Sequence, residues 1–317
     1  MPATPCRKSA ISRSDPSVTD PPAASAPVIH AARRQPLVGV ALMLAALFCF
    51  AVLDTTGKFL SQRYPVGVLV WARYLVPAIV LGTVLAPRMG RLLLATPRWR
   101  LQMLRAALLA AVSFLIMGGL KSIPMAEGTS LFFITPLIVT LLAGPVLGER
   151  VTPGQWLIAL FGFSGVLLIA RPDGHLPLWP VIMLLAGSLF YALYQLATRM
   201  LAPTERPLTT LYYTALVGAA LSTLALPAAA HSAWPTPRDT LLVLSLGVSG
   251  MAGHFLLIRA MAYAQASVLS PLIYVQLVWA TLMGWWVFGD LPGLSAVAGA
   301  AIIVVSGLAS AWLAHRR

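Results

Sequence analysis

The sequence predicts an all-α integral membrane protein in which ten transmembrane helices form two inverted five-helix repeats. The composition, the apolar runs and an internal repeat support this fold class. Of the 317 residues, 59% are hydrophobic and 10% are charged, and the mean hydropathy is +0.84. An ordinary globular protein has about 25% charged residues, so a soluble fold of this composition would expose apolar surface throughout. A cytosolic enzyme is therefore excluded, and with Cys6 and Cys49 as its two cysteines so is a secreted disulfide scaffold.

Ten apolar runs follow a polar N-terminal segment. Residues 1–35 are rich in Pro, Ser and Ala, which predicts a disordered cytoplasmic tail. Each run is close to the length of about 20 residues that a helix needs to cross a bilayer, and prolines and glycines lie in the gaps. The predicted spans are 37–57, 66–86, 101–120, 127–147, 154–171, 178–200, 208–230, 240–262, 267–289 and 294–314.

The basic residues predict how the chain is oriented. A net charge of +13 could suggest nucleic acid as a partner, but the basic residues lie in short segments between apolar runs. Of the 22 Lys and Arg residues, five lie on the side opposite the N-terminus, Arg73 lies within a span, and the remaining sixteen lie on the N-terminal side. Cytoplasmic loops of membrane proteins carry the excess of Lys and Arg. We therefore expect no nucleic-acid partner, and both termini in the cytoplasm of a bacterium, with the chain in the inner membrane.

An internal repeat divides the chain. Residues 36–149 superimpose on 177–290 without a gap when the sequence is shifted by 141 residues. The chemistry of charged residues is kept at Lys58/Arg199 and Glu149/Asp290. Each unit holds five spans, an odd number, so the second unit must enter the membrane upside down. We expect repeats at 36–172 and 177–314 around a central site, an arrangement that many secondary transporters use for alternating access.

Three segments resemble the EamA-domain branch of the drug/metabolite transporter superfamily. They are GTSLFFITPLIVTLLAGPVLGERVTPGQWLIALFGFSGVLLIARP (128–172), ASVLSPLIYVQLVWATLMGWWVFGDLPG (266–293) and VWARYLVPA (70–78). The WARY and LFFITP stretches look closest to the subgroup that includes S-adenosylmethionine and riboflavin uptake proteins. The sequence departs from the family pattern at two positions. Leu277 stands where the second repeat often has Pro, so whether the helix breaks there is left open. Gln276 stands where a Glu is often found, so a carboxylate proton carrier is absent at that position.

The resemblance covers nearly the whole chain beyond the tail, and it implies a function. It implies ATP-independent transport of a small metabolite, such as an amino acid, a cofactor or a drug-like compound, across the inner membrane. We expect a small-molecule substrate and the lipid bilayer as partners, no cofactor and no metal site. A homodimer is left open.

Charged residues within the spans are the first candidates for function, because a charge in a bilayer is costly unless it is paired or hydrated. Asp54 and Lys58 lie four residues apart near the outer end of the first span, where they form either a gate or a structural ion pair. Arg73 lies about 10 Å into the second span, and it could bind an anionic substrate group or pair with Asp54. Glu127 is either a protonatable group or an exposed carboxylate at a helix N-terminus. His254 is a candidate proton relay, although a buried histidine with satisfied hydrogen bonds is more common.

Uncharged polar residues within the spans are expected to contact the substrate together with Arg73. Tyr274 and Gln276 lie near the middle of the ninth span, at the depth of a midplane site. Tyr191 and Gln195 lie in the sixth span, and Gln195 is the repeat equivalent of Asp54. For most aromatic residues, packing or an interfacial position is the simpler interpretation.

The alternative function is a membrane-embedded serine protease. GFSG (162–165) and GVSG (247–250) resemble the serine motif of rhomboid-type proteases, with His254 as a candidate base. Small residues at helix contacts explain both motifs more simply. We therefore expect a carrier and not an enzyme.

Overall fold

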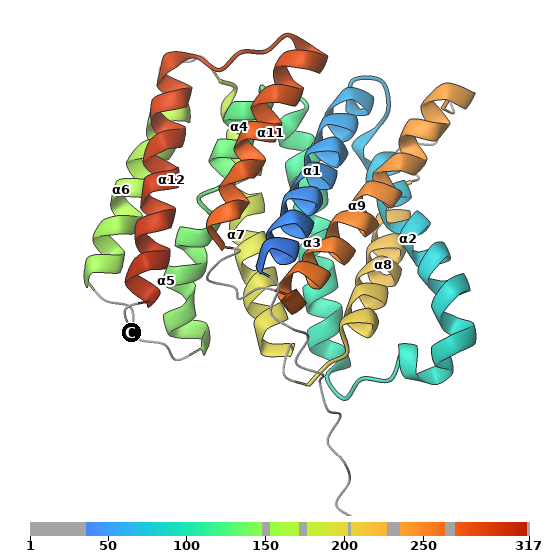
Figure 1. Ribbon diagram of the computed structural model, residues 1–317. Helices are drawn as coiled ribbons and strands as arrows, with labels where there is room; N and C mark the ends of the chain where they lie inside the picture. Colours follow the sequence, from blue (N-terminus) through green and yellow to red (C-terminus); the bar gives the residue numbers. More distant parts are fainter. Residues whose placement is uncertain are drawn as a thin grey trace, which may run out of the picture. The chain divides into compact units, whose positions relative to one another are not determined.

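Helices form every regular element in the part of the chain that the computed structural model describes (Figure 1). This part covers residues 36–315, apart from 148–152, 171–175, 202–203, 227–234 and 264–269. The predicted tail, residues 1–35, and Glu149 lie outside the described residues, as does the side chain of Arg199. The predicted all-α fold class is confirmed.

The two halves contain corresponding elements. The first half contains α1 (Pro36–Ser61), α2 (Val66–Met89), the 3₁₀ turn η1 (Gly90–Leu93), α3 (Trp99–Leu120), α4 (Met125–Phe132), α5 (Thr135–Leu147) and α6 (Pro153–Ala170). The second contains α7 (Leu178–Leu201), α8 (Pro207–Thr223), α9 (Pro237–Tyr263), the 3₁₀ turn η3 (Ser270–Tyr274), α11 (Val275–Met283), the π-helical turn η4 (Gly284–Phe288) and α12 (Leu294–His315). Helices α8 and α12 begin 141 residues after α2 and α6, respectively.

The length and composition of the helices fit a multi-pass membrane protein. Five described helical segments, 37–61, 66–93, 99–120, 178–198 and 237–257, are long and apolar enough to cross a bilayer. Four shorter apolar helical segments cover 125–139, 156–169, 272–288 and 294–309. The count of ten complete spans stays a prediction.

The fourth predicted span, 127–147, is interrupted. Helix α4 ends at Phe132, and α5 begins at Thr135, one residue before Pro136. Proline has no backbone N–H and disfavours helical geometry at the residue before it. The carbonyl of Phe132 accepts hydrogen bonds from Thr135 Oγ1 at 2.7 Å and from Ser188 Oγ at 3.4 Å. These hydroxyls satisfy a carbonyl group at the break, as a broken helix within a membrane requires. The prediction of one continuous helix is wrong here, whereas at Leu277 the helix α11 continues without a break.

Side-chain contacts establish that the first helices of the two halves run in opposite directions. Lys58, late in α1, reaches the carbonyl of Ile123, just beyond the end of α3, so α1 and α3 run the same way. Arg105, early in α3, contacts Thr198, late in α7, so α3 and α7 run opposite ways. Helix α7 is therefore inverted relative to its counterpart α1. The first residues of α1 and the last of α12 lie at the same end of the helices (Figure 1).

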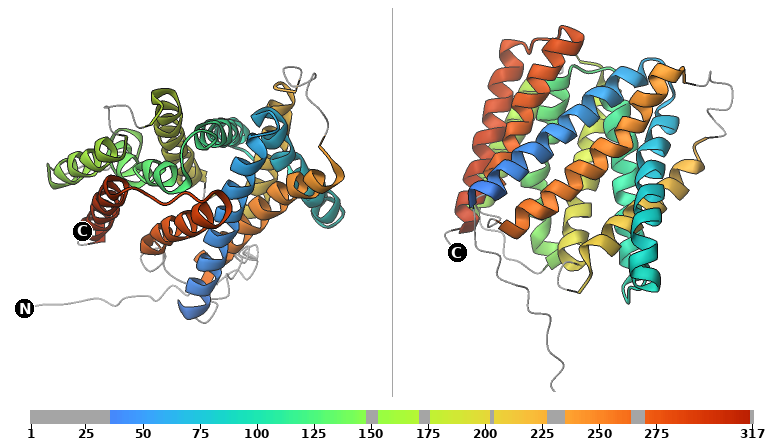
Figure 2. Two further views of the ribbon diagram at one scale, coloured as in Figure 1. Left: turned by 90° about the horizontal axis from the view of Figure 1, so that it is seen from above. Right: turned by 45° about the vertical axis from the view of Figure 1, so that its right-hand side comes forward.

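The two halves pack against each other along their lengths, with α1 on α9, α3 on α7 and α6 on α12 (Figure 2). At the crossing of α6 and α12, a Cβ atom added to Gly165 would lie 2.7 Å from the carbonyl oxygen of Gly299. A Cβ atom on Gly299 would lie 2.6 Å from the carbonyl oxygen of Gly165. Only glycine allows the two backbones to come this close.

Candidate functional site

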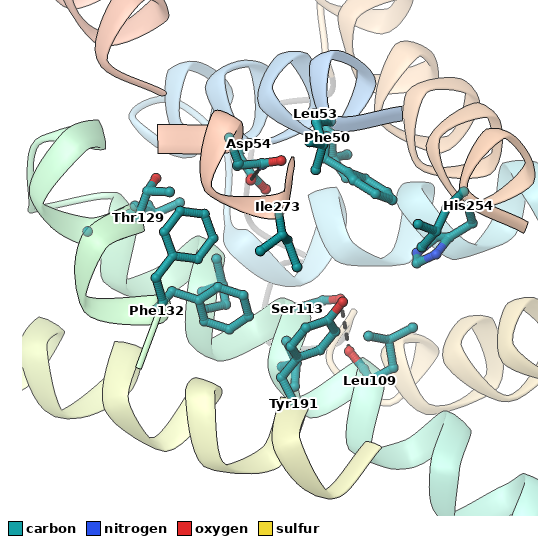
Figure 3. A pocket seen from close by; sticks show the side chains of 18 of the residues that line it. Phe50, Leu53, Asp54, Leu109, Ser113, Thr129, Phe132, Tyr191, His254 and Ile273 are labelled. Carbon is teal, nitrogen blue, oxygen red and sulfur yellow. Dashed lines mark hydrogen bonds between the residues drawn. The ribbon is translucent and has the colours of Figure 1, made fainter. Parts of the chain in front are cut away.

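A cavity of about 140 Å³ lies between the two halves (Figure 3). Helices α1, α2, α3 and α4 of the first half line it together with α7, α9, η3 and α11 of the second. Several of the lining residues form pairs that are separated by 141 residues. These pairs are Phe50/Tyr191, Ser113/His254, Ile116/Leu257 and Phe132/Ile273. The cavity therefore lies where equivalent positions of the two repeats face each other, which is where inverted-repeat transporters hold their substrate.

Two opposite charges face this cavity without pairing. Asp54 on α1 accepts a hydrogen bond of 3.4 Å from Gln276 Nε2. Arg73 on α2 lies with its guanidinium 5.9 Å from the ring centre of Tyr74, and no described residue accepts a hydrogen bond from it. Asp54 and Arg73 act on each other electrostatically but form no ion pair within 4.0 Å. Both head groups are therefore available to a charged ligand.

Aromatic side chains form two walls of the cavity. The rings of Phe132 and Tyr191 lie 5.1 Å apart, and Tyr191 stacks on Tyr194 at 5.4 Å with an angle of 15° between the planes. Across the cavity, His254 packs against Phe50 in an edge-on contact at 5.0 Å. Figure 3 shows Phe132 and Tyr191 on the side of the cavity opposite Phe50. Such surfaces suit a planar or cationic ligand.

Five of the nine predicted site residues line the cavity: Asp54, Arg73, Tyr191, His254 and Gln276. Gln195 is half-buried on α7 and does not line it. Tyr274 packs on Phe133 at 5.6 Å, and its hydroxyl lies against Gly307 of α12. Residues two apart on a helix do not share a face, so Tyr274 points away when Gln276 points in. In this conformation Tyr274 and Gln195 do not line the cavity together with Gln276, and their contact with the substrate stays a prediction.

Lys58 and Glu127 lie at one end of the cavity rather than in its lining. Lys58 Nζ donates to the carbonyl of Ile123 at 2.9 Å and pairs with Asp290 Oδ2 at 3.3 Å. The predicted ion pair of Asp54 with Lys58 is not formed, because Asp54 turns to Gln276 and Asp290 lies within reach of the ammonium. Glu127 is 9% exposed, so it is not the exposed carboxylate that its place at a helix N-terminus allowed.

Arg105 is a buried residue that sequence reasoning missed, because its place near the start of a span put it among the loop arginines. It is 6% exposed and joins the two halves at the end of α3 away from Lys58. Its guanidinium donates to Thr198 Oγ1 at 2.6 Å, Thr214 Oγ1 at 2.6 Å and Tyr194 OH at 2.7 Å. Its Cζ atom also lies 4.5 Å from the ring centre of Tyr194. The hydroxyl-bearing residues in the sequences of α7 and α8 could have indicated this burial, since a buried arginine needs hydrogen-bond acceptors of this kind.

The two GxSG motifs lie at helix contacts. Ser164 is exposed on α6, and its hydroxyl donates to the carbonyl of Phe161 at 2.7 Å. Ser249 lies on α9 five residues before His254, which places the two side chains about 140° apart around the helix at 3.6 residues per turn. In the second motif Gly247 packs against Val76. Among the described residues, neither serine hydroxyl is hydrogen-bonded to His254.

Sequence comparison identifies the family. The model of the EamA-like transporter family matches this chain twice, at residues 37–171 and 178–311. The chain belongs to this family. This EamA-like transporter is a multi-pass membrane protein, and it is a secondary transporter of a small metabolite. The family resemblance of its motifs is confirmed.

Several relatives of this EamA-like transporter have named substrates. It is 26% identical to an S-adenosylmethionine uptake transporter of Rickettsia bellii, over 86% of this chain and 92% of the relative. It is 28% identical to a riboflavin transporter of Vibrio cholerae, over 86% of this chain and 93% of the relative. It is 25% identical to the pseudopaline exporter CntI of Pseudomonas aeruginosa, over 86% of this chain and 95% of the relative. A chain of known crystal structure matches with a TM-score of 0.62 and 26% identity, over 89% of this chain and 98% of that one.

Proposed function

We propose that this transporter moves a metabolite that carries a positive and a negative group beside a planar ring. The observation that supports this proposal is the pair of opposite charges, Asp54 and Arg73, that face one aromatic cavity without neutralising each other. A guanidinium presents a planar fork of donors that matches a carboxylate. A carboxylate in turn attracts an ammonium or sulfonium group. Tyr191 and Phe132 supply a surface on which a ring can stack, and Gln276 supplies an amide beside Asp54.

The names of the relatives support the same chemistry. S-adenosylmethionine combines an amino-acid head group, a sulfonium and a purine, and riboflavin has a planar ring system. We infer that the substrate belongs to this range of amino-acid and cofactor-sized metabolites.

The size of the cavity supports transport by alternating access. At about 140 Å³ it is smaller than a typical ligand pocket of about 300–1,000 Å³. A substrate of cofactor size therefore requires the two halves to move apart. Polar contacts between the halves lie at both ends of the cavity, with Lys58 and Asp290 at one end and Arg105 and Thr198 at the other. Breaking the contacts at one end while those at the other end stay formed would admit substrate from one side of the membrane at a time.

We further propose that both termini lie in the cytoplasm of a bacterial cell with this protein in its inner membrane. The excess of basic residues on the N-terminal side supports this orientation, as does the location of both ends of the helical part at one end of the structure (Figure 1). A homodimer would add a second cavity rather than complete this one, because residues of both halves of one chain line it.

The proposed function includes no catalytic step. Ser164 is exposed on α6 and does not line the cavity. Replacing Ser164 and Ser249 with Ala should leave uptake into vesicles unchanged, whereas loss of activity at normal expression would favour the protease.

Ligand binding to the purified protein tests the substrate class. S-adenosylmethionine, riboflavin and an aromatic amino acid are the probes, and a rise in the melting temperature reports binding. Arg73→Gln should weaken binding of the two probes that carry a carboxylate, S-adenosylmethionine and the amino acid, by about tenfold or more, since a charged hydrogen bond contributes about 1.5–3 kcal/mol. Arg88→Gln is the matched control, because Arg88 lies exposed on the same helix. Binding by Arg73→Gln that equals the wild type would reject the assignment.

Asp54→Asn separates the two charges of the ligand. It should weaken binding of S-adenosylmethionine, which carries a sulfonium and an ammonium, and leave riboflavin binding little changed. An equal loss for both probes would show that Asp54 supports the cavity instead of contacting the cation.

A further inference from the structure

A second group of charged residues lies beyond the cavity, at the end of α1. Three segments meet there: the last turns of α1, the first turn of α4 and the connection between η4 and α12. Lys58 Nζ lies 3.3 Å from Asp290 Oδ2 and 2.9 Å from the carbonyl oxygen of Ile123. The same ammonium lies 4.6 Å from the ring centre of Phe288. Lys58 belongs to the first half and Asp290 to the second, so this ion pair ties the two halves together.

Backbone geometry determines where Asp290 lies. Gly289 has φ +74°, in the left-handed region that favours glycine, and it ends the π-helical turn η4. The amide of Asp290 then donates to the carbonyl of Gly284 at 3.2 Å. The chain therefore turns back directly before Asp290, and the carboxylate is held beside the end of α1. The side chain of Asp290 is partly exposed, so this carboxylate reaches the surface of the protein at that end.

Glu127 is the unsatisfied member of the cluster. It is 9% exposed, and its Oε2 atom is buried with no hydrogen-bond partner among the described residues. The backbone amide of Gly293 lies beside the carboxylate, and Lys58 and Asp290 are the charged side chains that act on it. When all three groups are ionised, two carboxylates share one ammonium and the cluster has a net charge of −1. A buried carboxylate with one oxygen left unpartnered is costly in its charged form.

We propose that Glu127 is a proton-binding site that controls the ion pair of Lys58 with Asp290, and through it the access to the cavity from this end. With a proton on Glu127, the Lys58 ammonium interacts with Asp290 alone, and α1 is held to the connection before α12. When Glu127 loses the proton, its negative charge attracts Lys58 and repels Asp290. The ion pair weakens, and this end of the cavity opens.

The proposal rests on the transport function, since it concerns access to the same cavity, but its test needs no substrate. Both native cysteines, Cys6 and Cys49, are replaced with Ser, and Ile116 in the cavity lining is replaced with Cys. A membrane-impermeant maleimide is added to right-side-out and to inverted vesicles at about pH 6 and about pH 8.5. A reference protein with Gln62→Cys, an exposed position at the same end, corrects for ionisation of the thiol itself.

When the maleimide is added on the side of the membrane that the Lys58 end faces, labelling of the cavity cysteine should rise with pH. This rise should exceed the rise in labelling of the reference protein. Glu127→Gln, which imitates the protonated side chain, should give low labelling at both pH values. Asp290→Asn removes the ion pair and should give high labelling at both. Glu205→Gln, an acid at the other end that accepts a hydrogen bond from Thr96, is the matched control and should keep the pH response.

A pH response in Glu127→Gln equal to that of the parent protein would overturn the proposal, as would labelling of the parent that does not change with pH. If Glu127→Gln does not accumulate, Asp290→Asn alone tests the proposal. The proposal requires that labelling of the cavity cysteine in Asp290→Asn no longer changes with pH. Failure of the Arg73 binding test would reject the substrate class and leave these outcomes unaffected.

Discussion

Phe50 and Tyr191 face one cavity from opposite halves of the chain, at positions separated by 141 residues. The helices that hold them, α1 and α7, are the first of their repeats and run in opposite directions. The two rings are thus equivalent positions that face each other across the substrate cavity. Both should contribute to binding of a planar ligand.

Removing either ring should weaken binding of such a ligand. An aromatic contact contributes about 0.5–1.5 kcal/mol beyond its area, so Phe50→Ala and Tyr191→Ala should each reduce the affinity several-fold in a calorimetric titration with S-adenosylmethionine or riboflavin. Tyr191→Phe keeps the ring, so it should retain the part of the affinity that stacking contributes. Phe161→Ala, at an exposed position on α6, is the control. Unchanged affinity in both alanine variants would contradict this role.

Replacing Arg105 should destabilise the protein rather than abolish binding directly, since Arg105 does not line the cavity. Arg105→Met removes three short hydrogen bonds that a buried guanidinium donates, and we expect a loss of about 2 kcal/mol or more in the free energy of unfolding. Arg105→Lys should recover only part of this, because an ammonium lacks the planar fork. Denaturant unfolding in detergent measures the effect, with Arg100→Met on an exposed residue of the same helix as control. Equal stability of the two methionine variants would be inconsistent with this network.

The crossing of α6 and α12 should not tolerate a methyl group. Gly165→Ala or Gly299→Ala places a Cβ atom within 2.7 Å of a facing backbone oxygen, and overpacking of this kind costs about 1–3 kcal/mol. Gly250→Ala is the matched control, because its Cβ atom would meet Leu53 at an ordinary 3.8 Å. Melting temperatures in one detergent should fall for the first two variants and stay near the wild type for the third. A fall of the same size in all three would indicate a general cost of replacing glycine.

Tyr64 should make the stability depend on pH in the alkaline range. Its hydroxyl donates to Asp239 Oδ2 at 2.7 Å, and this hydrogen bond raises the pKa of Tyr64 above its usual value of 10.0. A raised pKa in the folded state stabilises the fold below pH 10 and ceases to do so as the pH rises through the folded value. The difference in melting temperature between the wild type and Tyr64→Phe should therefore be constant up to about pH 9 and shrink above about pH 10.

The Asp239→Asn background tests the cause of that dependence. There Tyr64 no longer donates to a carboxylate, so Tyr64→Phe should cause a smaller and less pH-dependent change. A pH dependence that persists in this background would assign it to other groups.

The sequence was sufficient to predict much of the fold. Apolar runs bounded by Pro and Gly gave the positions of most helices, because a bilayer sets their length. The gap-free shift of 141 residues predicted which helices correspond. Arg73 and Asp54 could be singled out because few other charged residues lie within the apolar runs. The break before Pro136 was also visible in principle, since proline disfavours helix at the residue before it.

The contacts of these residues could not be predicted from local patterns. Lys58 pairs with Asp290, 232 residues away, instead of with Asp54 one turn away, and only the packing of α1 against the second half decides between them. Arg105 is buried because α7 and α8 bring Thr198 and Thr214 to it. Glu127 is buried because α4 packs among α7, α11 and α12. In each case the deciding partner comes from the other repeat.

The walls of the cavity come from both repeats, but its charges do not. Asp54 and Arg73 both belong to the first half, and the matching positions in the second half are Gln195 and Thr214. The scaffold therefore has approximate two-fold symmetry, whereas the electric field inside it has none. A dipolar molecule in this field has one favoured direction, and it keeps that direction whichever face of the membrane it came from.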